Sequence, residues 1–102
     1  MDDPQADVFG DWLDRQANTK VVGDRLSTRS SALANFIFSF GHTQVWVGTY
    51  DYKLRDDGDT ISLPKWAKRY QELEGKQDDH RIVAVIARRL LKQAIEETII
   101  QQ

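Results

Sequence analysis

The order of hydrophobic patterns between Val8 and Leu63 constrains the fold more than any other feature of this chain. Apolar residues at helical spacing come first, a serine-rich segment that can open a further helix follows, and an alternating β pattern closes the run. The two alternating segments are separated by Arg55–Asp59, whose aspartates and glycine are typical of a turn. This order predicts helices packed against a β-hairpin in an α+β domain.

The expected elements of the first half follow from periodicity and capping residues. We expect a helix over residues 5–16, a short helix or strand over 18–26, and a third helix capped by Ser27 or Thr28 and running to about Phe40. The valines of the second element suit a helix and a strand about equally.

The second half is expected to contain a hairpin and two helices. One strand should run from Thr43 to Leu54 and return over residues 60–63. Pro64 is expected to start a helix that Gly75 ends. Asp78 or Asp79 should cap a final long helix over about residues 80–99.

Two apolar surfaces have two interpretations each. Trp46, Tyr50 and Tyr52 are expected on one strand face, which is favoured as core but could also stack nucleic-acid bases. The final helix has a wide apolar stripe, which could close the monomer's own core or pair with a second copy.

Two strings carry a resemblance to a known family. Leu26–Phe36 (LSTRSSALANF) resembles the turn and recognition helix of bacterial helix-turn-helix regulators, and Lys53–Leu63 (KLRDDGDTISL) resembles the wing of winged-helix regulators. The resemblance covers about residues 8–72. It implies a winged helix-turn-helix-like core of three short helices and a β-hairpin over residues 8–63, with two further helices over 64–102.

The same resemblance implies how the chain would bind double-stranded DNA. The third helix would enter the major groove, and the wing would lie against the backbone or the minor groove. Asparagine can pair with adenine, while serine and arginine can contact phosphate or guanine. The residues implied in these contacts are Arg29, Ser30, Ser31, Asn35, Lys53 and Arg55.

Composition bounds the class of protein. A chain of 102 residues is expected to form a single domain. The net charge of −2 argues mildly against a non-specific polyanion binder. Without cysteine there is no disulfide framework or thiolate metal site, and no apolar run approaches membrane-spanning length. A cytoplasmic protein is therefore expected.

Catalytic and metal-binding patterns are weak throughout the chain. Asp51–Lys53 matches half of a nuclease pattern, but Glu74–Lys76 matches it equally well. Neither His42 nor His80 has a recognisable metal-ligand partner in the sequence. We therefore expect no enzyme activity, no metal and no cofactor.

Two functions remain as hypotheses. The first is a small DNA-binding transcriptional regulator of winged-helix type that acts as a homodimer. The alternative is a non-enzymatic protein-interaction module, such as an adaptor, assembly subunit or inhibitor, which binds through the aromatic hairpin or the C-terminal helix. The acidic balance of the chain favours the alternative.

Overall fold

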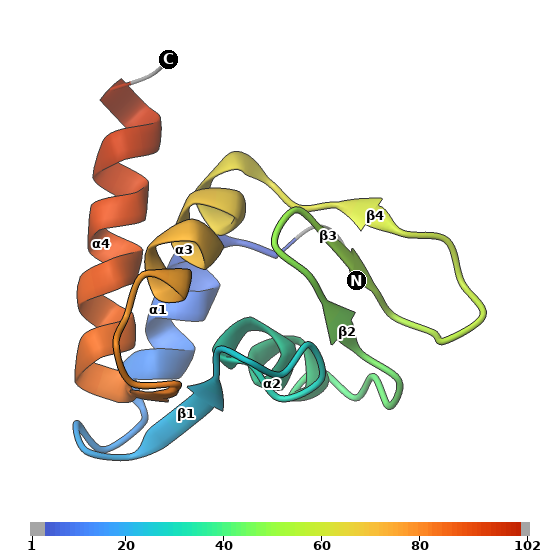
Figure 1. Ribbon diagram of the computed structural model, residues 1–102, viewed down its shortest axis with the longest axis horizontal. Helices are drawn as coiled ribbons and strands as arrows, with labels where there is room; N and C mark the ends of the chain where they lie inside the picture. Colours follow the sequence, from blue (N-terminus) through green and yellow to red (C-terminus); the bar gives the residue numbers. More distant parts are fainter. Residues whose placement is uncertain (1–3, 101–102) are drawn as a thin grey trace.

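The computed structural model describes the backbone of residues 4–100 and the side chains of residues 4–98. Figure 1 shows helices gathered on one side of the molecule and a small β-meander projecting on the other. The elements are α1 (Ala6–Asp14), β1 (Val21–Asp24), α2 (Ala32–Phe38), β2 (Trp46–Val47), β3 (Asp51–Lys53), β4 (Ile61–Ser62), α3 (Lys65–Gly75), β5 (Arg81–Val83) and α4 (Ala84–Ile100). This mixture of helices and antiparallel strands confirms the α+β class.

The segment after α1 is a strand, so the helix expected there is wrong and the strand alternative is confirmed. β1 pairs antiparallel with β5, with Val21 opposite Val83 and Asp24 opposite Arg81. β-branched valines suit this extended pairing. Within the described residues, two helices rather than three therefore precede the meander.

Helix α2 is shorter than expected and starts later. Ser27 and Thr28 do not cap it, because the Ser27 hydroxyl oxygen accepts the backbone N–H groups of Arg29 and Ser30 and closes a turn instead. Ser31 is the N-cap, and its hydroxyl oxygen accepts the N–H of Ala34. The local hydrogen bonds of one serine therefore delay the helix to Ala32.

The expected strand over residues 43–54 is wrong as a single element. The chain turns back after Val47, with the N–H of Gly48 donating to the carbonyl of Asp51 at 2.8 Å. β2, β3 and β4 form an antiparallel meander in which Val47 faces Tyr52 and Tyr52 faces Ile61. The hairpin is therefore a three-stranded sheet.

The final helix begins at Ala84 rather than near His80. Residues 81–83 pair with β1, and the side chain of Asp79 accepts the N–H of Arg81 in a local turn instead of capping a helix. Helix α3 ends at Gly75 as expected, and Pro64 stands one residue before its start, in the N-cap position.

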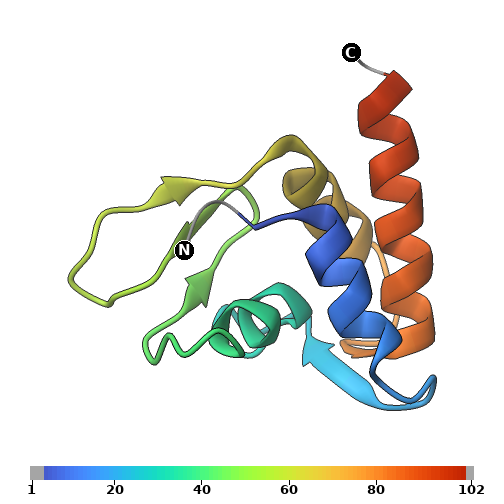
Figure 2. The same cartoon turned by 180° about the vertical axis from the view of Figure 1, so that it is seen from behind.

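The core lies where α1, α2, α3 and α4 meet. Figure 2 shows α1 in front, with α4 beside it and α2 below. The Phe9 ring sits at the centre, 5.0 Å from Phe36 and 5.2 Å from Tyr70 between ring centroids. Alanines of α4 face the same core, so the apolar stripe of α4 largely closes the monomer.

Candidate functional site

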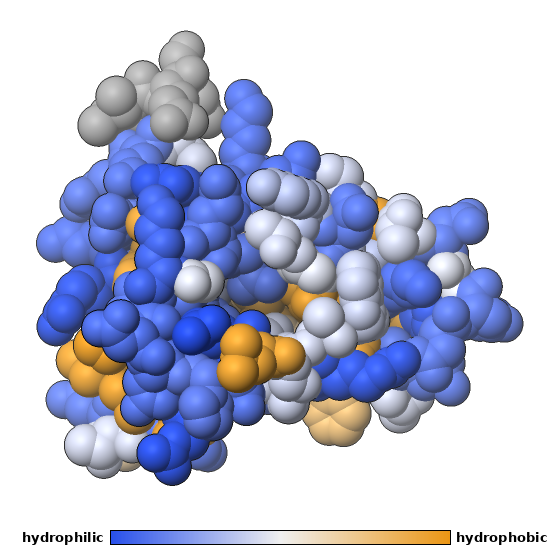
Figure 3. All heavy atoms as spheres, in the orientation of Figure 1, coloured by the Kyte–Doolittle hydropathy of each residue, from blue (hydrophilic) through white to orange (hydrophobic). Residues whose placement is uncertain are grey.

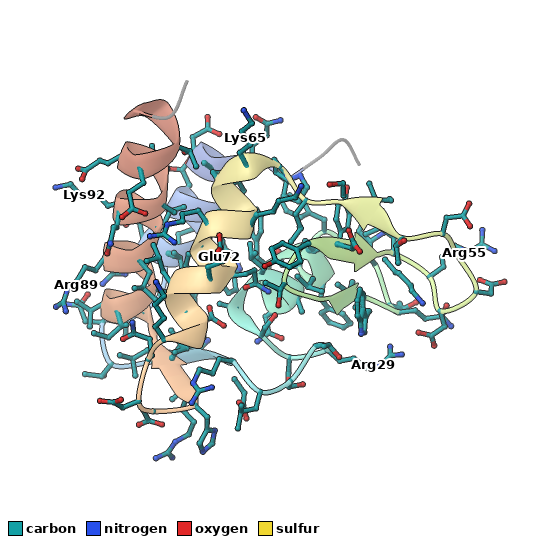
Figure 4. The ribbon with its side chains drawn as sticks, turned by 45° about the horizontal axis from the view of Figure 1, so that its top comes forward. Arg29, Arg55, Lys65, Glu72, Arg89 and Lys92 are labelled. Atoms are coloured by element: carbon teal, nitrogen blue, oxygen red, sulfur yellow. The ribbon has the colours of Figure 1, made fainter. Side chains whose placement is uncertain are left out.

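The residues implied in DNA contact divide into two groups in the structure. Ser30, Ser31 and Asn35 belong to the start of α2, whereas Lys53 and Arg55 belong to the meander. Arg29 joins the groups, because its guanidinium forms an ion pair with Asp56 at 2.8 Å. Figure 4 shows Arg29 and Arg55 at the meander end of the molecule, away from α4.

The polar side chains near the start of α2 form hydrogen bonds within the protein, although Ser30 is exposed. The Asn35 amide donates to the carbonyls of Val22, at 2.7 Å, and of Ser30, at 3.2 Å. Ser31 is buried as the N-cap, and the Ser30 hydroxyl donates to the hydroxyl of Ser27. These polar groups tie α2 to β1 and to the preceding turn.

Helix α2 is mostly a core helix. Five of its seven residues are buried and Asn35 is half-buried. Phe38 is the one exposed residue of this helix. A helix that reads bases presents a polar outer surface to the groove. The surface offered by α2 is instead apolar at its C-terminal end.

The meander carries cations that are balanced by acids. Arg55 pairs with Asp57 at 3.4 Å, and the ammonium of Lys53 lies 5.6 Å from the centroid of the Trp46 ring. Aspartates at positions 51, 56, 57 and 59 outnumber these cations. The potential of this end is therefore not strongly positive.

The three strand aromatics do not share one face. Tyr52 is buried, Trp46 is half-buried, and Tyr50 in the β2–β3 turn is 58% exposed. The core interpretation is confirmed for Tyr52 alone, because the turn reverses the chain between Trp46 and the two tyrosines.

An aromatic hollow lies between α1 and the end of α2. Its floor is formed by Trp12, buried Phe36 and half-exposed Phe40, and it has a volume of about 370 Å³. The Phe36 and Phe40 rings meet edge to face at 5.2 Å, and Trp12 lies 5.8 Å from Phe36. Arg15, Gln16 and Ser39 form the polar rim. We call this feature the aromatic hollow.

A second cavity, of about 120 Å³, lies between α3, the turn before α2 and the β2–β3 turn. Glu74 lines it and is only 2% exposed. Burial raises the pKa of Glu74 to about 7, while the Tyr70 hydroxyl and the charge of Arg25 act in the opposite direction. The pKa of Tyr70 is in turn raised well above its usual value, chiefly by burial.

A carboxyl with a raised pKa beside a cavity is a candidate for chemistry. Three side chains that line this cavity carry buried polar atoms without a hydrogen-bond partner in the described part of the chain: Oε2 of Glu74, Nε of Arg25 and Oε1 of Gln71. We call Glu74, Tyr70, Arg25 and Gln71 the Glu74 cluster and, because the cavity beside it is small, interpret the cluster as a determinant of stability.

A third feature is an apolar groove between α1 and α4, which we call the α1–α4 groove. Gly10, Leu91 and Ile95 form its floor, and its volume is about 340 Å³. Asp14, Arg88, Lys92 and Glu96 border it. Figure 2 shows the two helices side by side on this face.

Sequence reasoning missed the hollow, the Glu74 cluster and the groove. Glu74 could have been found, because it lies on the same helical face as Ala67 and Tyr70, at spacings of seven and four residues. The hollow and the groove depend on how separate helices pack, and no local pattern indicates them.

The described part of the chain contains neither a metal-ligand cluster nor a membrane-spanning helix. Across residues 4–98, no three histidine, aspartate or glutamate side chains come together in a way that could hold a metal ion. No helix of the structure has the length and apolar character needed to cross a membrane, over the same described portion.

Comparisons with known proteins leave the family open. No protein-family model, no curated protein and no solved structure matches this chain.

Proposed function

We propose that the chain is a non-enzymatic protein-interaction module that binds a partner through the aromatic hollow. The observation that carries this proposal is the hollow itself, in which three aromatic rings, one of them half-exposed, are combined with the polar side chains of Arg15, Gln16 and Ser39. Interfaces draw most of their affinity from such desolvated sites surrounded by polar residues.

The exposure of the Phe40 ring supports the same proposal. The Phe40 ring is 50% exposed at the hollow, whereas Phe38, 56% exposed, lies two residues from Phe36 and Phe40 and is not part of the lining. On the face of the molecule shown in Figure 3, in contrast, hydrophobic residues emerge only in isolated places among hydrophilic ones.

The rim indicates the chemistry of the partner. Arg15 lines the hollow, and among the described residues it has no ion-pair partner. A partner that inserts an aliphatic or aromatic side chain and places a carboxylate beside Arg15 would satisfy both the floor and the rim. We therefore expect short segments in which an apolar anchor adjoins an acidic residue.

DNA binding by a winged-helix element is the competing proposal, and the position of Arg29 beside the meander is the observation in its favour. Against it stand the internal hydrogen bonds of Asn35 and the aspartates around Arg55. Base contact by Asn35 would require breaking two hydrogen bonds to backbone carbonyls, which stabilise the fold.

Selection from a displayed peptide library tests the proposal. We expect enriched peptides to contain an apolar anchor and an acidic neighbour, and to lose at least about tenfold in affinity for Phe40→Ser. Tyr50→Ser is the matched control, because Tyr50 is equally exposed but lies in the β2–β3 turn. Peptides that bind both variants as well as wild type would contradict the proposal.

Titration of a labelled random duplex distinguishes the DNA alternative. We expect no saturable binding at low salt. Tight binding that weakens steeply as salt rises, together with its loss in Arg29→Ala, would favour the regulator over the interaction module.

A further inference from the structure

The α1–α4 groove exists because the two helices have unequal lengths and one has a glycine at the contact. α4 has 17 residues and α1 has nine, so the axes are about 26 Å and about 14 Å long. Figure 1 shows the C-terminal end of α4 extending beyond the other helices. Gly10 lacks a side chain where α1 passes Leu91, so the floor of the groove stays open.

The charged side chains that border the groove differ in whether they have a partner within the chain. Arg88 is held within the chain, donating to the carbonyl of Leu13 at 2.8 Å and contacting Asn18 and Asp14. Lys92 and Glu96, by contrast, form no ion pair with any residue in the described part of the structure. Figure 4 shows Lys92 projecting from α4 on the side away from α3.

We propose that a second copy of this chain occupies the α1–α4 groove, forming a two-fold symmetric dimer with antiparallel α4 helices. Two-fold symmetry requires one surface to be complementary to itself. With the axis level with residue 94, one residue before Ile95, Lys92 of one copy faces Glu96 of the other, and the reverse pair forms on the other side of the axis. The apolar floor is covered, and both unpaired charges gain a partner.

The α1–α4 groove and the aromatic hollow lie on different surfaces of α1, so the proposed dimer does not depend on the hollow. Gly10 and Asp14 line the groove, whereas Trp12 and Arg15 line the hollow. Each copy in the dimer would keep its own hollow free, so loss of peptide binding and loss of the dimer are distinguishable.

Charge reversal with analytical ultracentrifugation tests the dimer. We expect wild type to associate reversibly between micromolar and near-millimolar concentration. Lys92→Glu and Glu96→Lys should each weaken the dimer at least about tenfold, because each places like charges together on both sides of the axis. The double variant Lys92→Glu/Glu96→Lys should restore wild-type association.

Mixing the two single variants gives the sharpest result. One variant carries glutamate at both positions and the other carries lysine, so the mixture should associate at least about tenfold more tightly than either alone. Lys68→Glu and Glu72→Lys are matched controls, with the same charges at the same spacing on α3. Circular dichroism of each variant shows whether it remains folded.

Three outcomes overturn the inference. Wild type that stays monomeric over the whole concentration range excludes a second copy as the occupant. A dimer that the reversals at positions 92 and 96 leave unchanged, or that the α3 controls weaken equally, uses another surface. A mixture that associates no more tightly than its components excludes the antiparallel pairing.

Discussion

Replacing Glu74 with glutamine should stabilise the protein, and the gain should depend on pH. Glu74 is 2% exposed, and burial raises the pKa of its carboxyl from the usual value of 4.5 to about 7. The folded protein therefore holds this proton more tightly than the unfolded chain does. Glutamine has nearly the same shape and stays neutral, so it removes the titration without leaving a cavity.

The sign and size follow from proton linkage. Because the folded state binds more protons between pH 4.5 and about 7, the free energy of unfolding falls as pH rises through that interval. At about 1.4 kcal/mol for each pH unit, the loss attributable to Glu74 reaches about 3 kcal/mol above pH 7. Below pH 4.5 this loss is absent, since the carboxyl is protonated in both states.

Urea unfolding of wild type and Glu74→Gln across this pH interval measures the difference directly. We expect nearly equal stabilities at the acid end, and a variant that is more stable by about 3 kcal/mol at slightly alkaline pH. Glu72→Gln is the control, because Glu72 is an exposed carboxyl on the same helix, and its effect should stay within about 0.5 kcal/mol. A difference that does not change with pH, or a variant less stable at alkaline pH, would refute the reasoning.

Three substitutions test the packing. Gly23→Ala should lower the free energy of unfolding by at least about 3 kcal/mol or abolish folding, because the added Cβ would lie 2.1 Å from the backbone nitrogen of Ala32. Circular dichroism and thermal melting measure this loss. Asn35→Ala should cost about 1–3 kcal/mol in urea unfolding by removing two hydrogen bonds to backbone carbonyls, and an unchanged midpoint would show that they contribute nothing. Gly10→Ala should add about 0.5–1 kcal/mol, measured in dilute protein by thermal melting, because alanine favours a helix and its Cβ meets Leu91 at an ordinary 3.6 Å; a lower midpoint would contradict this.

Local patterns in the sequence were sufficient for part of the fold. Helical spacing located α1 and α3, the proline and glycine bracketed α3 within a residue, and the change to alternating residues located the meander. Each of these elements depends on interactions within a few residues along the chain. The implied DNA contacts and the function remain predictions that the experiments above can test.

The errors arose where backbone groups find hydrogen-bond partners other than those of the expected helix. Residues 81–83 precede α4 directly and were expected to be its first turn. They form a strand instead, because they pair with β1. Ser27 has the character of a helix cap, yet its hydroxyl oxygen accepts hydrogen bonds within a turn and leaves that position to Ser31. The intrinsic preference of a residue for helix or strand contributes less free energy than these competing hydrogen bonds. The hydrogen bonds therefore decide the secondary structure.

The sequence by itself determined the class of the domain and the order of most elements. Only the tertiary structure decided that Asn35 supports β1, that Glu74 is enclosed with Tyr70, and that α1 leaves a groove against α4. The physical reason is that burial and charge depend on which surfaces meet across long sequence separations. A periodic pattern specifies that a face is apolar, but not what covers it.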